Sequence, residues 1–244
     1  MLRHVAKLTA LLVMTGWCAG VIRGQPARWQ GQEVFVDLFD GKTLDGFTQH
    51  GGKAKYHVEE GQIVGTAVPN TPNSFLCTDR LFRDFVLEFE FRVDPGLNSG
   101  VQIRSRVFDS PAVYRVDGPD GGTRVIRVPA GRVHGYQVEI DPSPRAWTAG
   151  IYDEGRRGWL FDLKENEAAR KAFRQNEWNH VRVECIGTSI RTWLNGVPAA
   201  DLTDGMTREG FIALQVHGIG NNPENAGKQV RWRNLRIAEL PPAP

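Results

Sequence analysis

Residues Tyr136-Gln137-Val138-Glu139 alternate apolar and polar side chains, and the same alternation recurs in Val101-Gln102-Ile103-Arg104 and in Leu214-Gln215-Val216-His217. Successive side chains of a β-strand point to opposite faces, so each glutamine shares a face with the ionisable residue two positions later. The apolar residues then face a core. Three such strands in one sheet would present amides, a guanidinium, a carboxylate and an imidazole together, which favours a polar ligand site.

Strand signals of this kind recur along the whole chain, and helical periodicity is almost absent. Glu60-Gly61 is expected to form a hairpin turn, and Asn195-Gly196 to join strands 178–186 and 189–194. One short helix is expected around Asn166 to Phe173. The remaining strands are predicted near residues 34–39, 55–59, 62–67, 74–78, 84–93, 99–107, 123–128, 135–141, 147–152, 158–162, 210–217 and 229–239. Many antiparallel strands with one short helix at most predict an all-β, two-sheet antiparallel β-sandwich.

The first residues differ from the rest of the chain. Arg3 and Lys7 lead into an apolar run too short to span a bilayer, and small residues follow at Ala19 and Gly20. We therefore predict a signal peptide over residues 1–24, a single domain over 33–239 and a C-terminal tail over 240–244. This predicts an exported protein, periplasmic or extracellular, with no transmembrane span after cleavage. Cys18 raises a lipoprotein alternative, which bulky Trp17 disfavours.

The charge of the chain is balanced. Cleavage after Gly20 removes Arg3 and Lys7 and no acid, so the formal net charge falls from +2 to zero. A protein without excess positive charge lacks the electrostatic attraction that nucleic acids require. We therefore expect no nucleic-acid partner.

Residues 108–135 depart from the strand pattern. They are rich in Gly, Pro, Asp and Arg, and only 123–128 has strand character. Long irregular insertions in compact domains are usually functional or mobile. Because this one lies between two of the glutamine-bearing strands, it is placed to overhang the polar face, either as a lid or as a surface loop.

Several motifs occur in the order found in one known family. They are Phe35-Val36-Asp37-Leu38-Phe39-Asp40-Gly41-Lys42-Thr43-Leu44-Asp45-Gly46-Phe47, Asp84-Phe85-Val86-Leu87-Glu88-Phe89-Glu90-Phe91-Arg92, Asn98-Ser99-Gly100-Val101-Gln102-Ile103-Arg104, Gly135-Tyr136-Gln137-Val138-Glu139-Ile140, Thr148-Ala149-Gly150-Ile151-Tyr152, Glu177-Trp178-Asn179-His180-Val181-Arg182-Val183, Leu194-Asn195-Gly196, Leu214-Gln215-Val216-His217-Gly218 and Arg231-Trp232-Arg233-Asn234-Leu235-Arg236-Ile237. With this set the chain resembles the 3-keto-disaccharide hydrolase domain family over about residues 33–239.

The resemblance implies a concanavalin A-like jelly roll with a glycan groove on its concave sheet. It also implies cleavage of glycosides whose sugar is oxidised at C3, by removal of the C2 proton, elimination at C1 and addition of water. The family more often has Glu first and Gln second in the strand where this chain has Gln137 and then Glu139. Both positions share a face, so the order leaves open which residue transfers the proton.

This chemistry needs a base, a positive group near the ketone oxygen and an acid for the leaving group. We expect Glu139 and His217 in the acid–base roles and Arg104 to stabilise negative charge. Gln102, Gln137 and Gln215 are expected to bind sugar hydroxyls, with Glu90 and Tyr152 as further substrate-binding candidates. Two structural alternatives stay open: a cross-strand ion pair between Arg104 and Glu139, and an ordinary half-exposed strand for Glu90.

A Lewis acid would assist proton removal beside a carbonyl, so a divalent metal stays open as a cofactor. The sequence contains no His-x-x-x-His motif or aspartate-rich loop, and we assign no metal ligand. Two other functions for the same fold also stay open. They are a non-catalytic glycan-binding module and direct hydrolysis of unoxidised β-glucans.

Overall fold

The computed structural model describes residues 31–117 and 121–241. The expected signal peptide, residues 1–24, and tail residues 242–244 lie outside these ranges. The strands are Val36–Asp37 (β1), Phe47–Gly51 (β2), Lys55–Glu59 (β3), Gln62–Thr66 (β4), Ser74–Thr78 (β5), Phe85–Val93 (β6), Ser99–Arg106 (β7), Ala112–Asp117 (β8), Thr123–Val128 (β9), His134–Ile140 (β10), Ile151–Glu154 (β11), Gly158–Phe161 (β12), Asn179–Ile186 (β13), Ser189–Leu194 (β14), Val197–Thr203 (β15), Phe211–Val216 (β16) and Gln229–Glu239 (β17).

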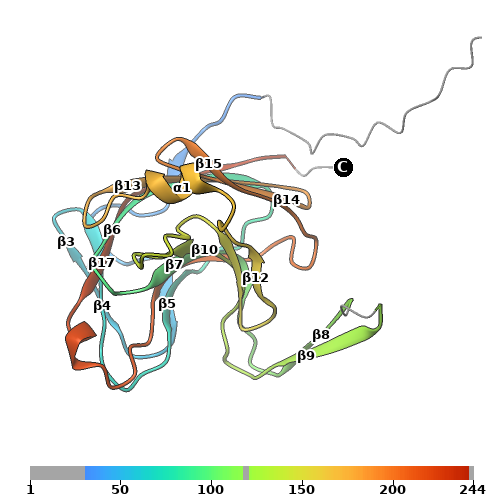
Figure 1. Ribbon diagram of the computed structural model, residues 1–244, viewed down its shortest axis with the longest axis horizontal. Helices are drawn as coiled ribbons and strands as arrows, with labels where there is room; N and C mark the ends of the chain where they lie inside the picture. Colours follow the sequence, from blue (N-terminus) through green and yellow to red (C-terminus); the bar gives the residue numbers. More distant parts are fainter. Residues whose placement is uncertain (1–30, 118–120, 242–244) are drawn as a thin grey trace, which may run out of the picture.

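These strands form two antiparallel sheets that pack face to face as a jelly roll (Figure 1). Sheet A has the order β15-β14-β13-β6-β17-β4-β3, with β1 paired to β17. Sheet B has the order β12-β11-β10-β7-β16-β5-β2. The hairpin of β8 and β9 stands off from the sandwich at the lower right of Figure 1. The predicted all-β sandwich is confirmed.

The core lies between the sheets and follows from strand alternation. In β6, Leu87, Phe89 and Phe91 are fully buried in it, while Glu88 and Glu90 occupy the alternate positions. Burying each large apolar side chain contributes about 1.5–3 kcal/mol relative to leaving it in water. Because β10 and β16 follow the same rule, Gln137, Glu139 and Gln215 point to the outer face of sheet B.

The predicted helix is confirmed as α1 (Glu167–Ala172). The side-chain oxygen of Asn166 accepts a hydrogen bond from the backbone N–H of Ala169, which caps the first turn. A short 3-10 turn, η1, spans Pro223–Asn225. In the part of the chain that the structure describes, neither helix has the length and apolar character needed to cross a lipid bilayer.

Both predicted turn pairs form hairpin turns, but one of them joins a different pair of strands from the pair predicted. Glu60-Gly61 joins β3 to β4, and Asn195-Gly196 joins β14 to β15, with positive φ at all four residues as tight hairpin turns require. The expected connection of β13 to β14 by Asn195-Gly196 was wrong, because residues 187–188 make that turn. Strands β2, β8 and β15 were not predicted.

Arg104 does not share the outer face with Gln102, so that prediction was wrong. The residue has a φ of +47°, and the pairing of β7 with both β10 and β16 shifts register around it. Such a β-bulge adds one residue to the strand and resets the alternation of its side chains. As a result, the Arg104 side chain points away from the polar face.

The guanidinium of Arg104 ties the two sheets together inside the protein. It is fully buried and donates hydrogen bonds to the backbone oxygens of Arg83 (2.7 Å) and Gly187 (2.7 Å) and to Oδ1 of Asp84 (2.8 Å). Asp84 is also fully buried, so the two charges compensate each other away from water. The alternative of an ion pair between Arg104 and Glu139 is therefore excluded.

Removing one partner of this pair leaves an unpaired buried charge. We expect Asp84→Ala to lower the free energy of unfolding by about 3–5 kcal/mol, measured by urea denaturation. Lys171→Ala, which breaks the exposed pair with Glu167, is the control and leaves the unfolding midpoint nearly unchanged. A loss below about 1 kcal/mol for Asp84→Ala would contradict a structural role for the pair.

Candidate active site

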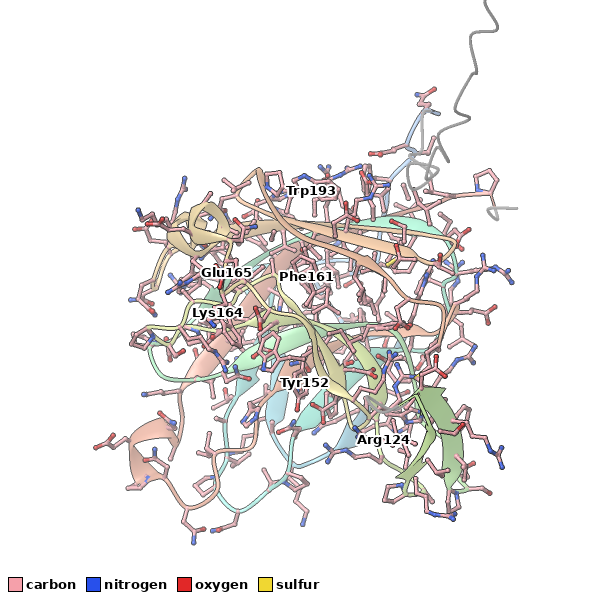
Figure 2. All side chains as sticks on the ribbon, turned by 45° about the vertical axis from the view of Figure 1, so that its right-hand side comes forward. Arg124, Tyr152, Phe161, Lys164, Glu165 and Trp193 are labelled. Atoms are coloured by element: carbon pink, nitrogen blue, oxygen red, sulfur yellow. The ribbon has the colours of Figure 1, made fainter. Side chains whose placement is uncertain are left out.

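A polar cavity of about 510 Å³ opens on the outer face of sheet B. Its walls come from β10, β11 and β12, from the connections that precede β5, β7 and β10, and from the segments that follow β10, β11 and β16. Figure 2 shows Tyr152 on the lower side of the sandwich, toward Arg124 of the β8–β9 hairpin, while Phe161 and Trp193 lie higher in the view. The lining residues are Asn73, Asn98, Arg132, Gln137, Glu139, Arg145, Tyr152, Asp153, Glu154, Gly155, Arg156, Gly158, Trp159 and His217.

Glu139 is the buried carboxylate of this cavity, with 4% of its surface exposed. Its Oε1 accepts a hydrogen bond from the side-chain amide of Asn98 (2.7 Å), and its Oε2 accepts one from that of Gln137 (2.8 Å). Burial raises the pKa of Glu139 from 4.5 to about 7, although both amide hydrogen bonds act to lower it. A carboxyl group that titrates near neutrality is suited to remove and return a proton.

The three glutamines lie together on one face, as predicted, but only Gln137 lines the cavity. Gln102 and Gln215 are 0% exposed, and each donates a hydrogen bond from Nε2 to Oε1 of Gln137, at 2.6 and 2.8 Å. Their amides therefore contact another amide rather than the cavity. The structure does not support the expectation that Gln102 and Gln215 contact sugar hydroxyls.

His217 lines the cavity directly after the end of β16, as predicted. Its Nδ1 lies 2.8 Å from the backbone oxygen of Gly218. A carbonyl only accepts hydrogen bonds, so Nδ1 carries the proton and Nε2 is the acceptor of the neutral ring. His217 and Glu139 are therefore both available to the same bound molecule.

Tyr152 also lines the cavity, where it belongs to an aromatic wall that the sequence did not reveal. The Tyr152 and Trp159 rings meet edge to face at 5.4 Å, and Trp159 meets Trp147 in the same way at 4.9 Å. The guanidinium of Arg145 lies 5.1 Å from the centre of the Trp159 ring. Burial raises the pKa of Tyr152, so its hydroxyl stays protonated and can donate or accept a hydrogen bond.

Two arginines supply positive charge to the cavity in place of Arg104. Arg132 forms an ion pair with Glu154, and Arg145 forms one with Asp141 at 2.8 Å. Each arginine side chain is about two-fifths exposed (41% and 43%), so part of each guanidinium faces the solvent. Neither was predicted from the sequence, because both lie in irregular connections without periodic signal.

Within the insertion 108–135, residues 112–117 and 123–128 pair as the β8–β9 hairpin. The hydroxyl of Tyr114 lies 2.7 Å from Nε2 of His134, and this contact holds the hairpin to the start of β10. The segment between β9 and β10 carries Arg132 into the cavity wall. The insertion thus contributes Arg132 to the site, from the segment that joins the hairpin to β10.

Glu90, a predicted substrate-binding residue, does not line this cavity. It belongs to β6 in sheet A, where it accepts hydrogen bonds from Arg233 (2.7 Å) and Asn234 (2.9 Å). Together with Glu88 and His180 it lines a separate depression on the opposite side of the sandwich. The structure therefore supports the alternative of a half-exposed strand.

Among residues 31–117 and 121–241, no three His, Cys, Asp or Glu side chains are grouped so that they could hold a metal ion. The predicted site residues Glu139, Gln137, Tyr152 and His217 meet at one cavity, whereas Arg104, Glu90, Gln102 and Gln215 do not line it. The cavity thus brings together Glu139, an imidazole, amides, three arginines, the carboxylates of Asp153 and Glu154, and aromatic rings.

The family described as the 3-keto-alpha-glucoside-1,2-lyase-like domain matches residues 34–238. The chain belongs to this family. A 3-keto-alpha-glucoside-1,2-lyase-like domain thus spans both sheets and includes every cavity residue named above. A comparison with curated protein sequences found no match.

Several solved structures share the fold of this lyase-like domain. A candidate glycosyl hydrolase from Parabacteroides distasonis ATCC 8503 is 18% identical, with a TM-score of 0.52 over 85% of this chain and 94% of that one. The carbohydrate-binding module CBM66 from Bacillus subtilis is 15% identical, with a TM-score of 0.51 over 80% and 96%. A Bacillus subtilis protein of unknown function with a galectin-like fold is 9% identical, with a TM-score of 0.53 over 82% and 92%. At these identities the likeness shows the jelly-roll fold alone.

The raised pKa of Glu139 couples folding to pH. The folded protein holds a proton at Glu139 up to about pH 7, whereas the unfolded chain releases it near 4.5, so stability falls as pH rises between these values. We expect Glu139→Gln to remove about 3 kcal/mol of this pH dependence. Urea denaturation of both proteins from pH 4 to 8 measures it. Parallel stability curves for the two proteins would contradict the raised pKa.

Proposed function

We propose that the protein is an exported enzyme that cleaves 3-keto-glycosides by removing the C2 proton. The observation that carries this proposal is the Glu139 carboxylate, buried in a polar cavity with a pKa of about 7. A ketone at C3 acidifies the hydrogen on C2, and a base that titrates near neutrality is effective at removing such a proton. Membership of the lyase-like family supports the same chemistry.

The reaction proceeds in two steps, an elimination and an addition of water. Glu139 takes the C2 proton, the C–H electron pair forms the C1=C2 bond, and the bond from C1 to the glycosidic oxygen breaks as that oxygen takes up a proton. Water then adds across the C1=C2 bond, with hydroxyl to C1 and hydrogen to C2. The sum is hydrolysis of the glycoside to the free 3-keto sugar and an alcohol.

Residues of the cavity wall protonate the leaving group, stabilise negative charge and bind the sugar ring. His217 delivers the proton to the leaving oxygen in its imidazolium form, from Nε2–H, because Nδ1–H is engaged by the backbone oxygen of Gly218. Arg132 and Arg145 provide positive charge for the enolate oxygen that develops at C3. Trp159 and Tyr152 offer apolar ring surface against which a sugar packs.

Two other functions would give different results in an assay with 3-keto and unoxidised glucosides. A glycan-binding module on this fold would hold the sugar without turnover, and the likeness to CBM66 motivates this comparison. Direct hydrolysis of unoxidised glucans needs a second carboxylate beside the scissile bond. In this cavity Glu154 is paired with Arg132, which disfavours that role.

The decisive assay compares release of the alcohol from a 3-keto-glucoside with release from the unoxidised parent glucoside. We expect release from the 3-keto-glucoside alone. Parallel reactions with a chelator measure the contribution of a divalent ion. Binding without release from either compound would establish the binding module, and release from the parent alone would establish direct hydrolysis.

Variants connect this turnover to Glu139. We expect Glu139→Gln to lower kcat by about 10²–10⁴-fold, which is the usual contribution of a general base. Glu90→Gln is the matched control, since Glu90 lies on the opposite sheet. Equal turnover in Glu139→Gln and Glu90→Gln would show that the base lies elsewhere.

A further inference from the structure

We propose that Gln102 and Gln215 are positioning residues that act through Gln137 to orient the Glu139 carboxyl group and to stabilise its ionised form. This inference rests on the proposed function. It gives the two buried glutamines a role distinct from the sugar contacts expected from the sequence. Together with Ser105 and Gln137 they form a connected set of hydrogen bonds, which we call the amide relay.

The register of sheet B brings the relay together. Gln137 pairs with Gln102 across β10 and β7, while Gly100 pairs with Glu139 on one side and Gln215 on the other. A Cβ atom at Gly100 would lie only 2.6 Å from Cγ and Cδ of Gln137. The absence of a side chain there gives Gln137 the space to reach across β7 toward Gln215.

The hydrogen bonds of the relay have one direction. The Ser105 hydroxyl donates to Oε1 of Gln102 at 2.8 Å, and Nε2 of Gln102 donates to Oε1 of Gln137 at 2.6 Å. Nε2 of Gln215 donates to the same oxygen at 2.8 Å. With its oxygen fixed by two donors, the amide of Gln137 must turn its NH₂ group toward Oε2 of Glu139.

Burial makes this orientation costly to reverse. Gln102 and Gln215 are 0% exposed and Gln137 is 3% exposed, so the hydrogen bonds among their amides are shielded from water. If the Gln137 amide were flipped, its NH₂ group would face the NH₂ groups of Gln102 and Gln215, and its oxygen would face the Glu139 carboxylate. These buried polar groups would then lack hydrogen-bond partners. The relay therefore keeps an N–H donor on Glu139, and Asn98 holds the other carboxylate oxygen.

Other charged and titratable groups also influence Glu139. Asp141 and Arg145 follow in the connection after β10, where Asp141 opposes ionisation and Arg145 favours it. Tyr152 and Glu154 of β11, Arg132 before β10 and His217 after β16 line the same cavity. Within the relay, Gln102 and Gln215 form hydrogen bonds with Ser105 and Gln137 rather than with these charged groups. The two glutamines can therefore be changed while the charges stay in place.

Removal of both donors to Gln137 has a defined consequence. Gln137 Oε1 loses its partners, its amide turns, and the Glu139 carboxylate loses one of its two amide donors. The pKa of Glu139 then rises further, by about one unit, because a hydrogen bond to the charged form is lost. The acid limb of the pH profile of kcat/KM moves up by the same amount, while KM stays within about twofold because neither glutamine lines the cavity.

Carbon-13 NMR of glutamate carboxyl-labelled protein tests this directly, with the Glu139 signal assigned by its absence in Glu139→Gln. We expect the titration midpoint to rise in Gln215→Met and to rise further in Gln102→Met/Gln215→Met. Gln49→Met is the matched control. Its amide donates hydrogen bonds to the backbone oxygens of Gly52 and Ala54 in the connection from β2 to β3, away from the relay, so the Glu139 midpoint stays unchanged.

A Glu139 midpoint equal to wild type in the folded double variant would overturn the proposal. So would a rise in KM with an unchanged pH profile, which would return the glutamines to substrate binding. If the double variant does not fold, Gln215→Met and Gly100→Ala, which displaces Gln137, decide the question by the same titration. The titration needs no turnover, so its failure is distinguishable from failure of the 3-keto-glucoside assay.

Discussion

The outer face of sheet B is organised around Glu139, a buried carboxyl group whose hydrogen-bond partners among residues 31–117 and 121–241 are neutral amides. Two neutral amides, from Asn98 and Gln137, supply the hydrogen bonds of Glu139. Amide donors offset part of the desolvation cost, whereas a directly bonded arginine would hold the carboxyl ionised at all physiological pH values. This balance places the pKa of Glu139 near 7, where the group both takes and returns a proton.

The bulge in β7 makes that arrangement compatible with the sandwich. A regular strand would place Arg104 two residues after Gln102 on the outer face, beside the glutamines. The bulge instead sends the guanidinium inside, where Asp84 and two backbone oxygens satisfy it. One strand thus contributes an amide to the polar face and an inter-sheet anchor to the interior. Within β7, Gln102 therefore contributes to the candidate site, whereas Arg104 contributes to stability.

Several features could be predicted from the sequence because they depend on local chemistry. The bounds of β17 follow from the alternation on either side of Asn234, where the strand shifts register, and α1 follows from the helix propensities of Glu167 to Ala172. β15 was missed because Pro198 and two alanines give little strand signal. Arg104 was misplaced because a bulge is a property of the pairing with β10 and β16, which one strand cannot reveal.

The candidate site shows the same division. Gln137, Glu139 and His217 were identified because they lie on strands or directly after one, where alternation fixes their face. Glu90 shares that kind of pattern, but the sequence does not say which of two sheets a strand joins. Arg132 and Arg145 come from irregular connections, and the burial that raises the pKa of Glu139 depends on tertiary packing, which strand alternation does not reveal.

The central claim is that the carbon–hydrogen bond at C2 breaks before the alcohol departs. The most direct test compares a 3-keto-glucoside carrying deuterium at C2 with its unlabelled form, by initial rates of alcohol release. We expect slower release from the deuterated substrate and loss of the label into water, both dependent on Glu139. Equal rates, with the deuterium retained in the sugar product, would contradict it.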